Sequence, residues 1–510
     1  MKLHHYFILC LAITLASIPF IKNAKHSIFS NSLKNNAPAI SMITSVEKSD
    51  ESSLPEPSQK KDSSLIPPYN QISDDELAEF PGATLVESGK GRGPKPDETL
   101  QVRVLKTNFK DPYVRTEVVL NKNTGNIVSR REMAADQLLV TLPKGMNEQA
   151  FIKWLNIPGV SITSITPSLS RLHFPSHAST SLQEIMKRLQ ENGLSTEPDI
   201  IYQQKLIDNT ENVTTQWALS NSDGGVDAID AWSIISQTPS IIIAIVDTGI
   251  RYTHQALAGN MWHNIAPTFG DVYGINAYAN NGNPMDDNGH GTHCAGTIGG
   301  INNYREDSIR GVTQKVQLMA CKYSDANGVG LTSDAISCID YALIHGAKII
   351  NCSWGSPDNS PGLYQELQKA QAQGVIIVAA AGNDALNDDQ GSFYPASYKL
   401  DNVITVAATT PGDDFAYFSN YGPTSVSLAA PGLNIYSAYA DADDSYAIMS
   451  GTSMAAPYVT GTLALLEAKF PKDAYKKIVS RLLTSTDHLP ILDGRTKAGR
   501  LNIAKAVSQP

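Results

Sequence analysis

The stretch SIIIAIVDTG, Ser240 to Gly249, is the clearest indication of the fold of this chain. Its run of six apolar, mostly β-branched residues fits a strand that is buried on both faces of a parallel sheet. Asp247 follows the run directly. An ionised carboxylate at such a position is costly to bury unless it is hydrogen-bonded. The stretch therefore predicts a buried strand whose carboxyl end carries a polar group in need of a partner.

Similar runs recur downstream and predict further strands: VQLMACKY (316–323), AKIINCSWG (347–355), GVIIVAAAGN (374–383) and NVITVAAT (402–409). Helical patterns lie between them. LTSDAISCIDYALIHG (331–346) has Thr332 or Ser333 as its N-cap and Gly346 as its stop, and PGLYQELQKAQAQG (361–374) is a second helix. This alternation predicts a doubly wound α/β domain with a mostly parallel sheet over residues 209–510. In such sheets, sites form beyond the carboxyl ends of the strands.

The stretch from residue 137 to residue 203 has a different rhythm. Its patterns read strand, helix, two paired strands, helix and strand. Asn147 and Ser181 are placed to cap the two helices, and Gly193 is placed to stop the second. This order predicts a small ferredoxin-like α+β domain over residues 136–208.

Three segments precede that domain. Residues 1–24 join a short basic start to an apolar run and small residues, which is typical of a secretory signal peptide, with a transmembrane anchor as the alternative. Residues 25–80 are rich in Ser, Asn, Pro and Lys and predict a disordered spacer. Residues 81–135 predict a β-rich segment with a hairpin turn at Asn123 to Gly125.

Composition narrows the functional classes. Hydrophobic residues make up 42% and charged residues 18% of the 510, as in an ordinary globular protein. From Thr210 onward there are 28 acidic and 17 basic residues, which argues against a nucleic-acid surface. No segment beyond the first is long and apolar enough to span a bilayer. We therefore expect a secreted protein, extracellular or periplasmic, that leaves the membrane once the signal is removed.

Signal removal leaves four cysteines: Cys294, Cys321, Cys338 and Cys352. None has the paired C-x-x-C spacing of a zinc site. A disulfide between Cys321 and Cys338 is one alternative in an exported protein, and buried free thiols are the other.

Three polar residues can meet Asp247 at the end of the sheet. His290 lies between glycines in DDNGHGTHCAGTIGG (286–300) and can act as a general base if a carboxylate fixes its tautomer. Ser453, in SGTSMAAP (450–457), opens a helix whose N–H groups favour developing negative charge. Asn383 can donate its amide to an oxyanion. Alone, each has a structural explanation: a core histidine, a helix cap or a turn.

Taken together, four stretches resemble the signature stretches of the subtilisin family (subtilases), which are serine proteases made as precursors. They are VDTG (246–249), GHGTHCAGT (289–297), AAAGN (379–383) and SGTSMAAP (450–457). The resemblance extends over residues 216–507. HGTHCAGT, with a cysteine beside the second histidine, is similar to the proteinase K-like branch. The order Asp, His, Ser along the chain is the one known for subtilisin.

The resemblance implies a catalytic set of Asp247, His290, Ser453 and Asn383. It makes the chain a serine endopeptidase that cuts proteins or peptides through an acyl-enzyme. It also implies substrate binding by main-chain hydrogen bonds, a mode that tolerates many side chains. The residues expected to bind substrate are Ser353, Trp354, Gly355, Ala381 and Gly382. His293 is expected to be structural. A catalytically silent relative that only binds peptides is the alternative.

The family also gives the first half a role. The ferredoxin-like segment is expected to be a prodomain that assists folding and inhibits the enzyme, removed by self-cleavage between about Tyr202 and Gln216. Slow folding of a large parallel sheet is a physical reason for such help. A permanently attached accessory domain is the alternative. The mature enzyme is expected to be a monomer.

The chain departs from the family at two positions. Ala256 stands where family members often have a calcium-binding aspartate, so no metal site is assigned. No cofactor is expected to be required. Calcium binding stays an alternative without a known site. Asp286 and Asp287 are either cation ligands or a brace for the His290 loop. Phe393 stands where the pocket for the residue before the cut usually has a small residue, which predicts a shallow pocket for modest side chains. Asp384, near the mouth of this pocket, would accommodate a basic side chain before the cut.

Overall fold

The protein is described from a computed structural model over residues 69–175, 182–204, 207, 216–222, 224–301 and 308–510. The expected signal peptide, most of the expected spacer and the Ser181 cap lie outside the described residues. Within the described ranges, no helix has both the length and the apolar character needed to cross a membrane.

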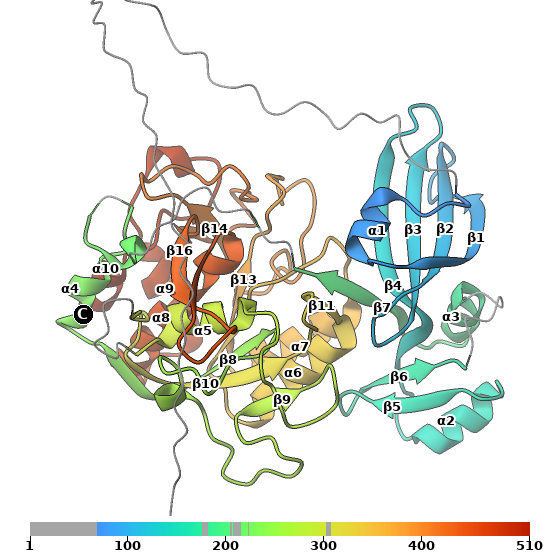
Figure 1. Ribbon diagram of the computed structural model, residues 1–510, viewed down its shortest axis with the longest axis horizontal. Coiled ribbons are helices and arrows are strands. Elements are labelled where there is room, and N and C mark those ends of the chain that lie inside the picture. Colours follow the sequence, from blue (N-terminus) through green and yellow to red (C-terminus); the bar gives the residue numbers. More distant parts are fainter. Residues whose placement is uncertain (1–68, 176–181, 205–206, 208–215, 223, 302–307) are drawn as a thin grey trace, which may run out of the picture. The chain divides into compact units, whose positions relative to one another are not determined.

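The second half of the chain is built on a seven-stranded parallel sheet (Figure 1). In spatial order its strands are β15 (Leu428–Pro431), β14 (Val403–Thr409), β13 (Ile376–Ala380), β12 (Ile349–Cys352), β8 (Gln237–Asp247), β10 (Lys315–Lys322) and β9 (Gly274–Asn276). The five apolar runs all form strands, and the α/β prediction is confirmed. The short strands β9 and β15 were not predicted from the sequence, because three or four residues show no clear pattern.

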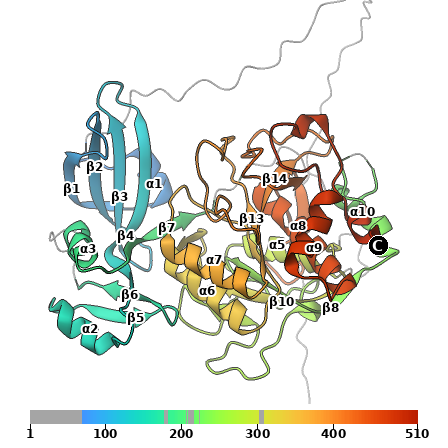
Figure 2. The same cartoon turned by 180° about the vertical axis from the view of Figure 1, so that it is seen from behind.

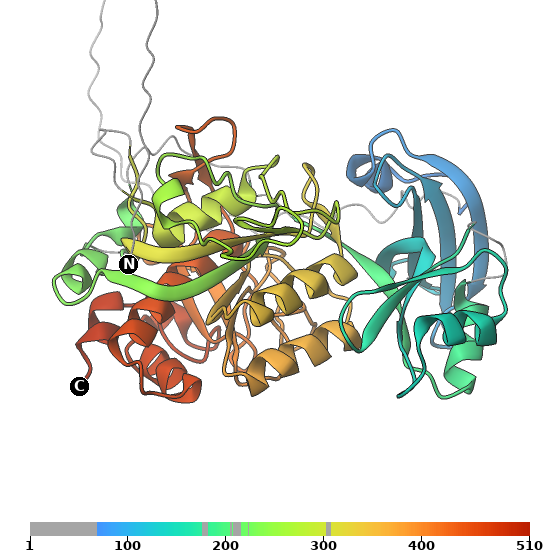
Figure 3. The ribbon, with the colours of Figure 1, turned by 90° about the horizontal axis from the view of Figure 1, so that it is seen from below.

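Helices cover both faces of this sheet. Along β8, Ile243 and Ile245 pack into one core with α5 (His290–Gly299) and α8 (Thr452–Lys469). Ala244 and Val246 pack into another core with α6 (Thr332–Ile344) and α7 (Pro361–Ala372). Figures 2 and 3 show α6 and α7, coloured gold, side by side. Alternate residues of a strand face opposite sides, so a continuous apolar run is what a doubly covered sheet requires.

The expected hydroxyl cap of α6 is wrong. The N-cap residue is Leu331, which makes no side-chain cap bond. Thr332 Oγ1 donates to the carbonyl of Ile200 over 3.2 Å, and Ser333 Oγ donates to Asp199 over 2.7 Å. Asp199 also accepts the Ser333 N–H over 3.1 Å. A distant carboxylate therefore caps this helix, which local sequence cannot reveal.

The first half forms an antiparallel sheet in the order β1-β2-β3-β4-β6-β5, with β7 also paired to β4. The strands are β1 (Thr84–Arg92), β2 (Glu98–Lys106), β3 (Tyr113–Asn121), β4 (Ile127–Thr141), β5 (Ser161–Ser164), β6 (Leu169–His173) and β7 (Thr196–Gln203). The sub-order β7-β4-β6-β5, with α2 (Glu148–Leu155) and α3 (Leu182–Glu191), is the ferredoxin-like arrangement. The expected boundary at 135/136 falls inside β4, so the two N-terminal parts share one sheet.

A helix lies inside the expected spacer, so the prediction of disorder up to residue 80 is wrong at its end. α1 (Asp74–Glu79) starts with a capping box in which Ser73 Oγ accepts the Glu76 N–H and Glu76 accepts the Ser73 N–H. Glu76 is fully buried and accepts the Arg103 Nε–H over 2.8 Å. The polar composition of this segment hid a buried ion pair with a strand 27 residues away.

The four cysteines of the second half are free and fully buried. Of the two alternatives, buried thiols hold and no bond joins Cys321 to Cys338. Both lie in the core between the sheet and α6.

Candidate active site

The end of β8 holds a buried carboxylate with three partners. Asp247 is fully buried, and its Oδ1 accepts the Thr248 N–H over 2.7 Å and His290 Nδ1–H over 2.8 Å. Gln204 Nε2 donates to the same oxygen over 3.0 Å. The partner that the sequence required for Asp247 is therefore His290, as expected.

Gly291 lets this pair form. α5 begins at His290, and a Cβ at Gly291 would lie 2.1 Å from the carbonyl oxygen of Gly249 and 3.0 Å from Asp247 Cβ. The Gly291 N–H donates to Thr248 Oγ1 over 2.9 Å. Any side chain at this position would push the helix, and His290 with it, away from the carboxylate.

The two acidic residues before His290 have protein partners. Asp286 accepts the N–H groups of Asn288, Gly289 and Thr292, each over 3.0 Å. Asp287 forms an ion pair with Lys322 over 2.6 Å. Of the two alternatives for this pair, the loop brace is the one that the contacts support, because the buried carboxylate of Asp286 already holds the turn that leads into α5.

The two histidines of α5 titrate in opposite directions. Burial disfavours the charged form of His290, but the neighbouring Asp247 carboxylate and its hydrogen bond outweigh burial and raise the pKa of His290. Burial lowers the pKa of His293 to about 3, and its Nε2 bonds to the carbonyl of Ile435 over 2.9 Å. His293 is thus neutral and tied to the backbone, in keeping with the structural role expected for it.

Ser453 lies in the first turn of α8, and Pro457 explains how its backbone is held. A proline has no N–H to donate to the carbonyl four residues earlier. The Ser453 carbonyl instead accepts Ser353 Oγ–H over 2.8 Å and the Cys294 thiol over 3.5 Å. Since Cys294 follows His290 by one turn of α5, this contact brings the serine helix against the histidine helix.

The hydroxyl of Ser453 does not bond to the histidine in this state. In the described part of the chain, Ser453 Oγ donates to the carbonyl of Ser353 over 2.8 Å and makes no hydrogen bond to His290. The side chain is nearly buried, with 8% of its surface exposed. The Asp–His contact is therefore formed, and the His–Ser contact needs a rotation of the serine side chain.

Asn383 follows β13 with its amide oriented by Thr452. The Asn383 Oδ1 atom accepts both the N–H and the Oγ1–H of Thr452 over 2.9 Å. Thr452 Oγ1 in turn accepts the Gly382 N–H over 3.1 Å. This leaves the Asn383 Nδ2–H₂ group on the side away from Thr452.

A cleft joins these elements, and most of the expected substrate-binding residues line it. Its lining includes Ser353, Trp354, Gly355, Ala380, Gly382, Asn383, Phe393, Thr452 and Ser453. Ala381 is an exception: it is fully buried and packs against Ala407 and Val426. Alternate residues face opposite sides of an extended chain, so Ala380 and Gly382 face the cleft and Ala381 faces away. The structure therefore places Ala381 outside the described lining of the cleft, unlike the other four residues expected to bind substrate.

The strand β7 runs into the same cleft. It pairs antiparallel with β11 (Val329–Leu331), and the next residue, Gln204, donates its N–H to the carbonyl of Gly328 over 3.1 Å. Gln203 and Gln204 both line the cleft. Tyr202 is buried with its ring centroid 5.1 Å from that of Trp354. Sequence reasoning missed Gln204 and β11, because a three-residue strand on a loop shows no periodicity.

Past the cleft, the chain touches the serine loop. Ile207 forms an antiparallel bridge with Ser450, three residues before Ser453. Gln204 thus contacts the end of β8 at Asp247, and Ile207 contacts the loop that leads to Ser453.

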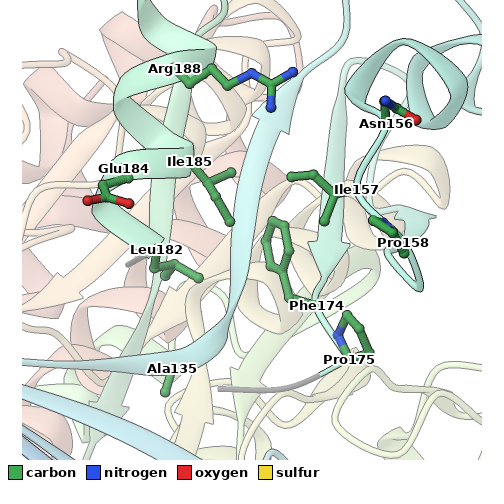
Figure 4. Close-up of a pocket in the computed structure, with 10 residues that line it drawn as sticks. All are labelled: Ala135, Asn156, Ile157, Pro158, Phe174, Pro175, Leu182, Glu184, Ile185 and Arg188. Carbon is green, nitrogen blue, oxygen red and sulfur yellow. The ribbon is translucent and has the colours of Figure 1, made fainter. Parts of the chain in front are cut away.

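A larger hollow of about 450 Å³ lies in the ferredoxin-like domain (Figure 4). Leu182 and Ile185 of α3 point toward Phe174 and Ile157 across it. Its described lining holds no serine, cysteine or histidine. Among the described residues, the hollow thus offers no such nucleophile, whereas the smaller cleft holds Ser453.

Among the described residues, one group of potential metal ligands lies close together: Asp247, His290 and Cys294, with ligand atoms within 4.8 Å. The first two already bond to each other. Burial raises the pKa of the Cys294 thiol well above its usual range, so it stays protonated and is a poor ligand. Ala256 is fully buried in an apolar core, so the usual calcium-binding carboxylate is missing there. The donor set does not fit a metal centre.

Comparisons with known proteins match the second half of the chain. The model of the Subtilase family, Peptidase_S8, matches residues 238–504. Subtilisin DY of Bacillus licheniformis is 35% identical over 251 residues, which are 49% of this chain and 85% of that protein. Thermitase of Thermoactinomyces vulgaris is 36% identical over 282 residues, or 55% and 93%. A thermophilic serine proteinase of Bacillus sp. (strain AK1) is 36% identical over 278 residues, or 54% and 64%.

Proposed function

The chain belongs to the subtilase family of serine proteases, and from this membership we propose that Asp247, His290, Ser453 and Asn383 hydrolyse peptide bonds of protein substrates. The main support for the proposal is the buried hydrogen bond of 2.8 Å between Asp247 and His290. His290 lies on α5, and this helix also contacts Ser453 through the thiol of Cys294. The same cleft holds the Asn383 amide.

In the proposed reaction, Ser453 Oγ first turns from the Ser353 carbonyl toward His290. His290 accepts the hydroxyl proton as the oxygen attacks the scissile carbonyl carbon, and Asp247 stabilises the resulting imidazolium. The raised pKa of His290 supports this role, because it reflects stabilisation of the charged form. His290 then donates its proton to the leaving amine, and an acyl-enzyme remains for water to hydrolyse.

Asn383 would stabilise the oxyanion. Because its Oδ1 accepts both donors of Thr452, the amide is oriented so that its Nδ2–H₂ group would donate to the developing charge. Because this orientation exists before the reaction, no reorganisation is needed in the transition state. The backbone N–H of Ser453, at the N-terminus of α8, would be the second donor.

The test of this function is labelling with a fluorophosphonate, which reacts with an activated serine, together with digestion of a denatured test protein. We expect the wild type to be labelled and to cut the test protein. A wild type that is neither labelled nor active would favour the silent, peptide-binding alternative.

Asn420 is a further positioning residue that the sequence did not indicate. It is 1% exposed, and its backbone N–H donates to the Gly382 carbonyl over 2.9 Å. Its Oδ1 accepts the Asp384 N–H over 3.0 Å, and its Nδ2 donates to the Ala381 carbonyl over 3.1 Å. One side chain thus holds the residues on both sides of Asn383.

We expect Asn420→Ala to lower kcat by about 10- to 100-fold with little change in KM, since a shift of about 1 Å in a catalytic group has an effect of this size. Asn402→Ala is the matched control, because Asn402 is also buried and bonds to the carbonyls of Leu367 and Val375, away from the cleft. Steady-state kinetics on both variants would test the assignment. Equal losses of kcat in the two would contradict it.

Phe393 restricts the pocket for the residue before the cut. A Cβ at Gly355 would lie 2.3 Å from the Phe393 ring, and a Cβ at Gly382 would lie 3.3 Å from it. With Gln203 and Gln204 in the cleft, the remaining hollow is about 50 Å³. We expect cleavage after modest side chains in a peptide library, and Phe393→Gly should shift the preference toward Phe and Tyr. A wild type that already prefers Phe or Tyr would contradict this.

We also propose that residues 69–204 act as an inhibitory prosegment that the enzyme removes from itself. The supporting contacts are the β7–β11 pairing and the presence of Gln203 and Gln204 in the cleft. Gln204 also bonds to Asp247. Substrate has no access to the cleft while this strand fills it.

Within the expected range between about Tyr202 and Gln216, we propose that the cut lies between Gln204 and Ile207. Gln204 lines the cleft together with Ser453, and Ile207 forms a bridge with Ser450, three residues before Ser453. N-terminal sequencing of the active enzyme should therefore give a start within residues 205–207. A start upstream of residue 137 would mean that the domain stays attached.

Release of the prosegment should depend on pH through Glu197. Burial raises the pKa of Glu197 to about 7, an effect that hydrogen bonds from Gly362 and Ser360 reduce and the charge of Asp199 adds to. In the released prosegment this carboxyl returns to its ordinary pKa of 4.5. Docking of the prosegment therefore takes up a proton. The contribution of Glu197 to the affinity of the prosegment is complete below pH 4.5 and is lost as pH rises through about 7.

We expect the dissociation constant of the cut prosegment to rise at least about 10-fold between pH 5 and pH 8. Glu197→Gln should flatten this dependence, because an amide does not titrate. Activity recovered on dilution at each pH measures the constant. An equally steep curve for Glu197→Gln would show that another group is responsible.

The remaining proposals concern the setting of the enzyme. Residues 1–24 would direct export, so the enzyme would act outside the cytoplasm, and it would do so as a monomer without a required cofactor. Any bound calcium would lie at a site other than Ala256.

A further inference from the structure

Residues 69–126, here called the N-terminal module, form a braced unit next to the ferredoxin-like domain. The module holds α1 and strands β1 to β3, and β3 pairs with the first half of β4. Buried Glu76 links its parts, because it accepts bonds from Arg103 over 2.8 Å and from Thr116 over 2.5 Å. A buried charge with several donors holds its neighbours in one arrangement.

The hairpin between β2 and β3 reaches the catalytic half of the chain. It turns over residues 107–112, closed by a bond from the Thr107 N–H to the Pro112 carbonyl over 2.8 Å. Lys110 Nζ donates to the carbonyl of Tyr278 over 2.9 Å and forms an ion pair with Asp334 in the first turn of α6. The ammonium also lies 4.7 Å from the centroid of the Tyr278 ring.

This ion pair is largely shielded from water. The Lys110 side chain is 20% exposed and the Asp334 side chain 2%. Arg171 of the ferredoxin-like domain bonds to the other oxygen of Asp334 over 3.0 Å. One catalytic-domain carboxylate therefore receives a cation from each of the two N-terminal parts.

An apolar cluster extends the same contact. It combines side chains of the module and β4 with β7 and β11: Phe80, Ala83, Leu105, Phe109, Val114, Ala134, Ile201, Val329 and Leu331. Phe109 also lies against Tyr278, with ring centroids 6.0 Å apart. The module thus covers the outer side of the β7–β11 pair, whose inner end enters the cleft.

We propose that the N-terminal module is a second docking surface for the catalytic domain, which keeps the cut prosegment bound through the Lys110 hairpin. The inference rests on the proposed inhibition by the prosegment. The ferredoxin-like domain supplies the first surface, where Asp199 and Glu197 meet the N-termini of α6 and α7. Two surfaces on one chain bind more tightly than either alone, because the second contact becomes intramolecular.

The first experiment measures how tightly the full-length chain holds its own cut prosegment. After self-cleavage the protein is diluted in steps, and the activity regained on a fluorogenic peptide gives an apparent dissociation constant. Lys110→Met should raise this constant at least about 10-fold, since it removes one partner of a shielded charge pair and keeps the apolar stem. The matched control is Lys95→Met, because Lys95 lies on the same module with a side chain 71% exposed. Equal constants for the two variants would overturn the proposal.

The second experiment does not need activity. In Ser453→Ala chains, which stay uncut, amide hydrogen exchange is followed at residues 276–279 and 329–335. With Lys110→Met added, these amides should exchange about 10-fold faster than with Lys95→Met added, because the hairpin no longer holds them. Identical exchange would overturn the second surface. An uncut wild type would instead count against the proposed function, so the two failures are distinguishable.

Discussion

Ser453→Ala should lower kcat by about 10⁶-fold, the fall seen when the nucleophile is removed from related enzymes. The loss follows from the chemistry, because an alanine has no oxygen to form the acyl-enzyme. The same change should leave the precursor at full length, since self-cleavage uses the same hydroxyl. Turnover of a fluorogenic peptide and mass spectrometry of the purified chain measure these two effects, and fluorophosphonate labelling should be lost with them.

Ser480→Ala is the control for this prediction. Ser480 is an exposed serine of α9 (Tyr475–Thr484), away from the cleft. Its replacement should leave labelling, turnover and processing within about 2-fold of the wild type, as is usual for exposed surface positions. If Ser453→Ala kept its label or processed itself, the nucleophile would have to be another residue and the proposed mechanism would be wrong.

Asp247→Asn should lower kcat by about 10⁴-fold while the protein stays folded. The asparagine keeps the shape of the side chain but can present an N–H to His290 Nδ1, which selects the wrong tautomer of the imidazole. It also removes the charge that raises the pKa of His290. His290 should therefore stay deprotonated to lower pH. The acid limb of the pH profile of kcat/KM should shift to lower pH.

Asp287→Asn is the matched control for the carboxylate. Asp287 is three residues from His290 and pairs with Lys322, but makes no contact with the imidazole in the described bonds. Its pH–rate profile should keep the acid limb of the wild type. An unchanged acid limb in Asp247→Asn would mean that this carboxylate does not tune His290.

Local sequence foresaw the elements with long, regular patterns. β8, β10, β12, β13 and β14 were visible because strands buried on both faces need uninterrupted apolar runs. Asn147 was visible as a cap because its side chain accepts the Ala150 N–H only three residues away. Both partners of such an interaction lie within one helical turn, so the local sequence is enough to predict it.

Other features depend on residues that are far apart in the chain. The cap of α6 comes from Asp199, more than 130 residues before the helix. α1 is ordered because Glu76 meets Arg103. The local sequence around Asp199 or Glu76 does not predict either interaction. Whether a charged side chain is buried depends on the residues that surround it after folding.

The residue order alone gave the groups proposed for catalysis, their succession along the chain and the strands after which Asp247 and Asn383 lie. The glycines and Pro457 around them also follow from the sequence, because close approach and a missing N–H are properties of those residue types. Three other features follow only from the folded chain: Gln204 lies against Asp247, Ser453 is turned toward the Ser353 carbonyl, and Ala381 faces away from the cleft. The reason is that these contacts join segments whose separation in space is set by packing of the whole domain, which no local pattern encodes.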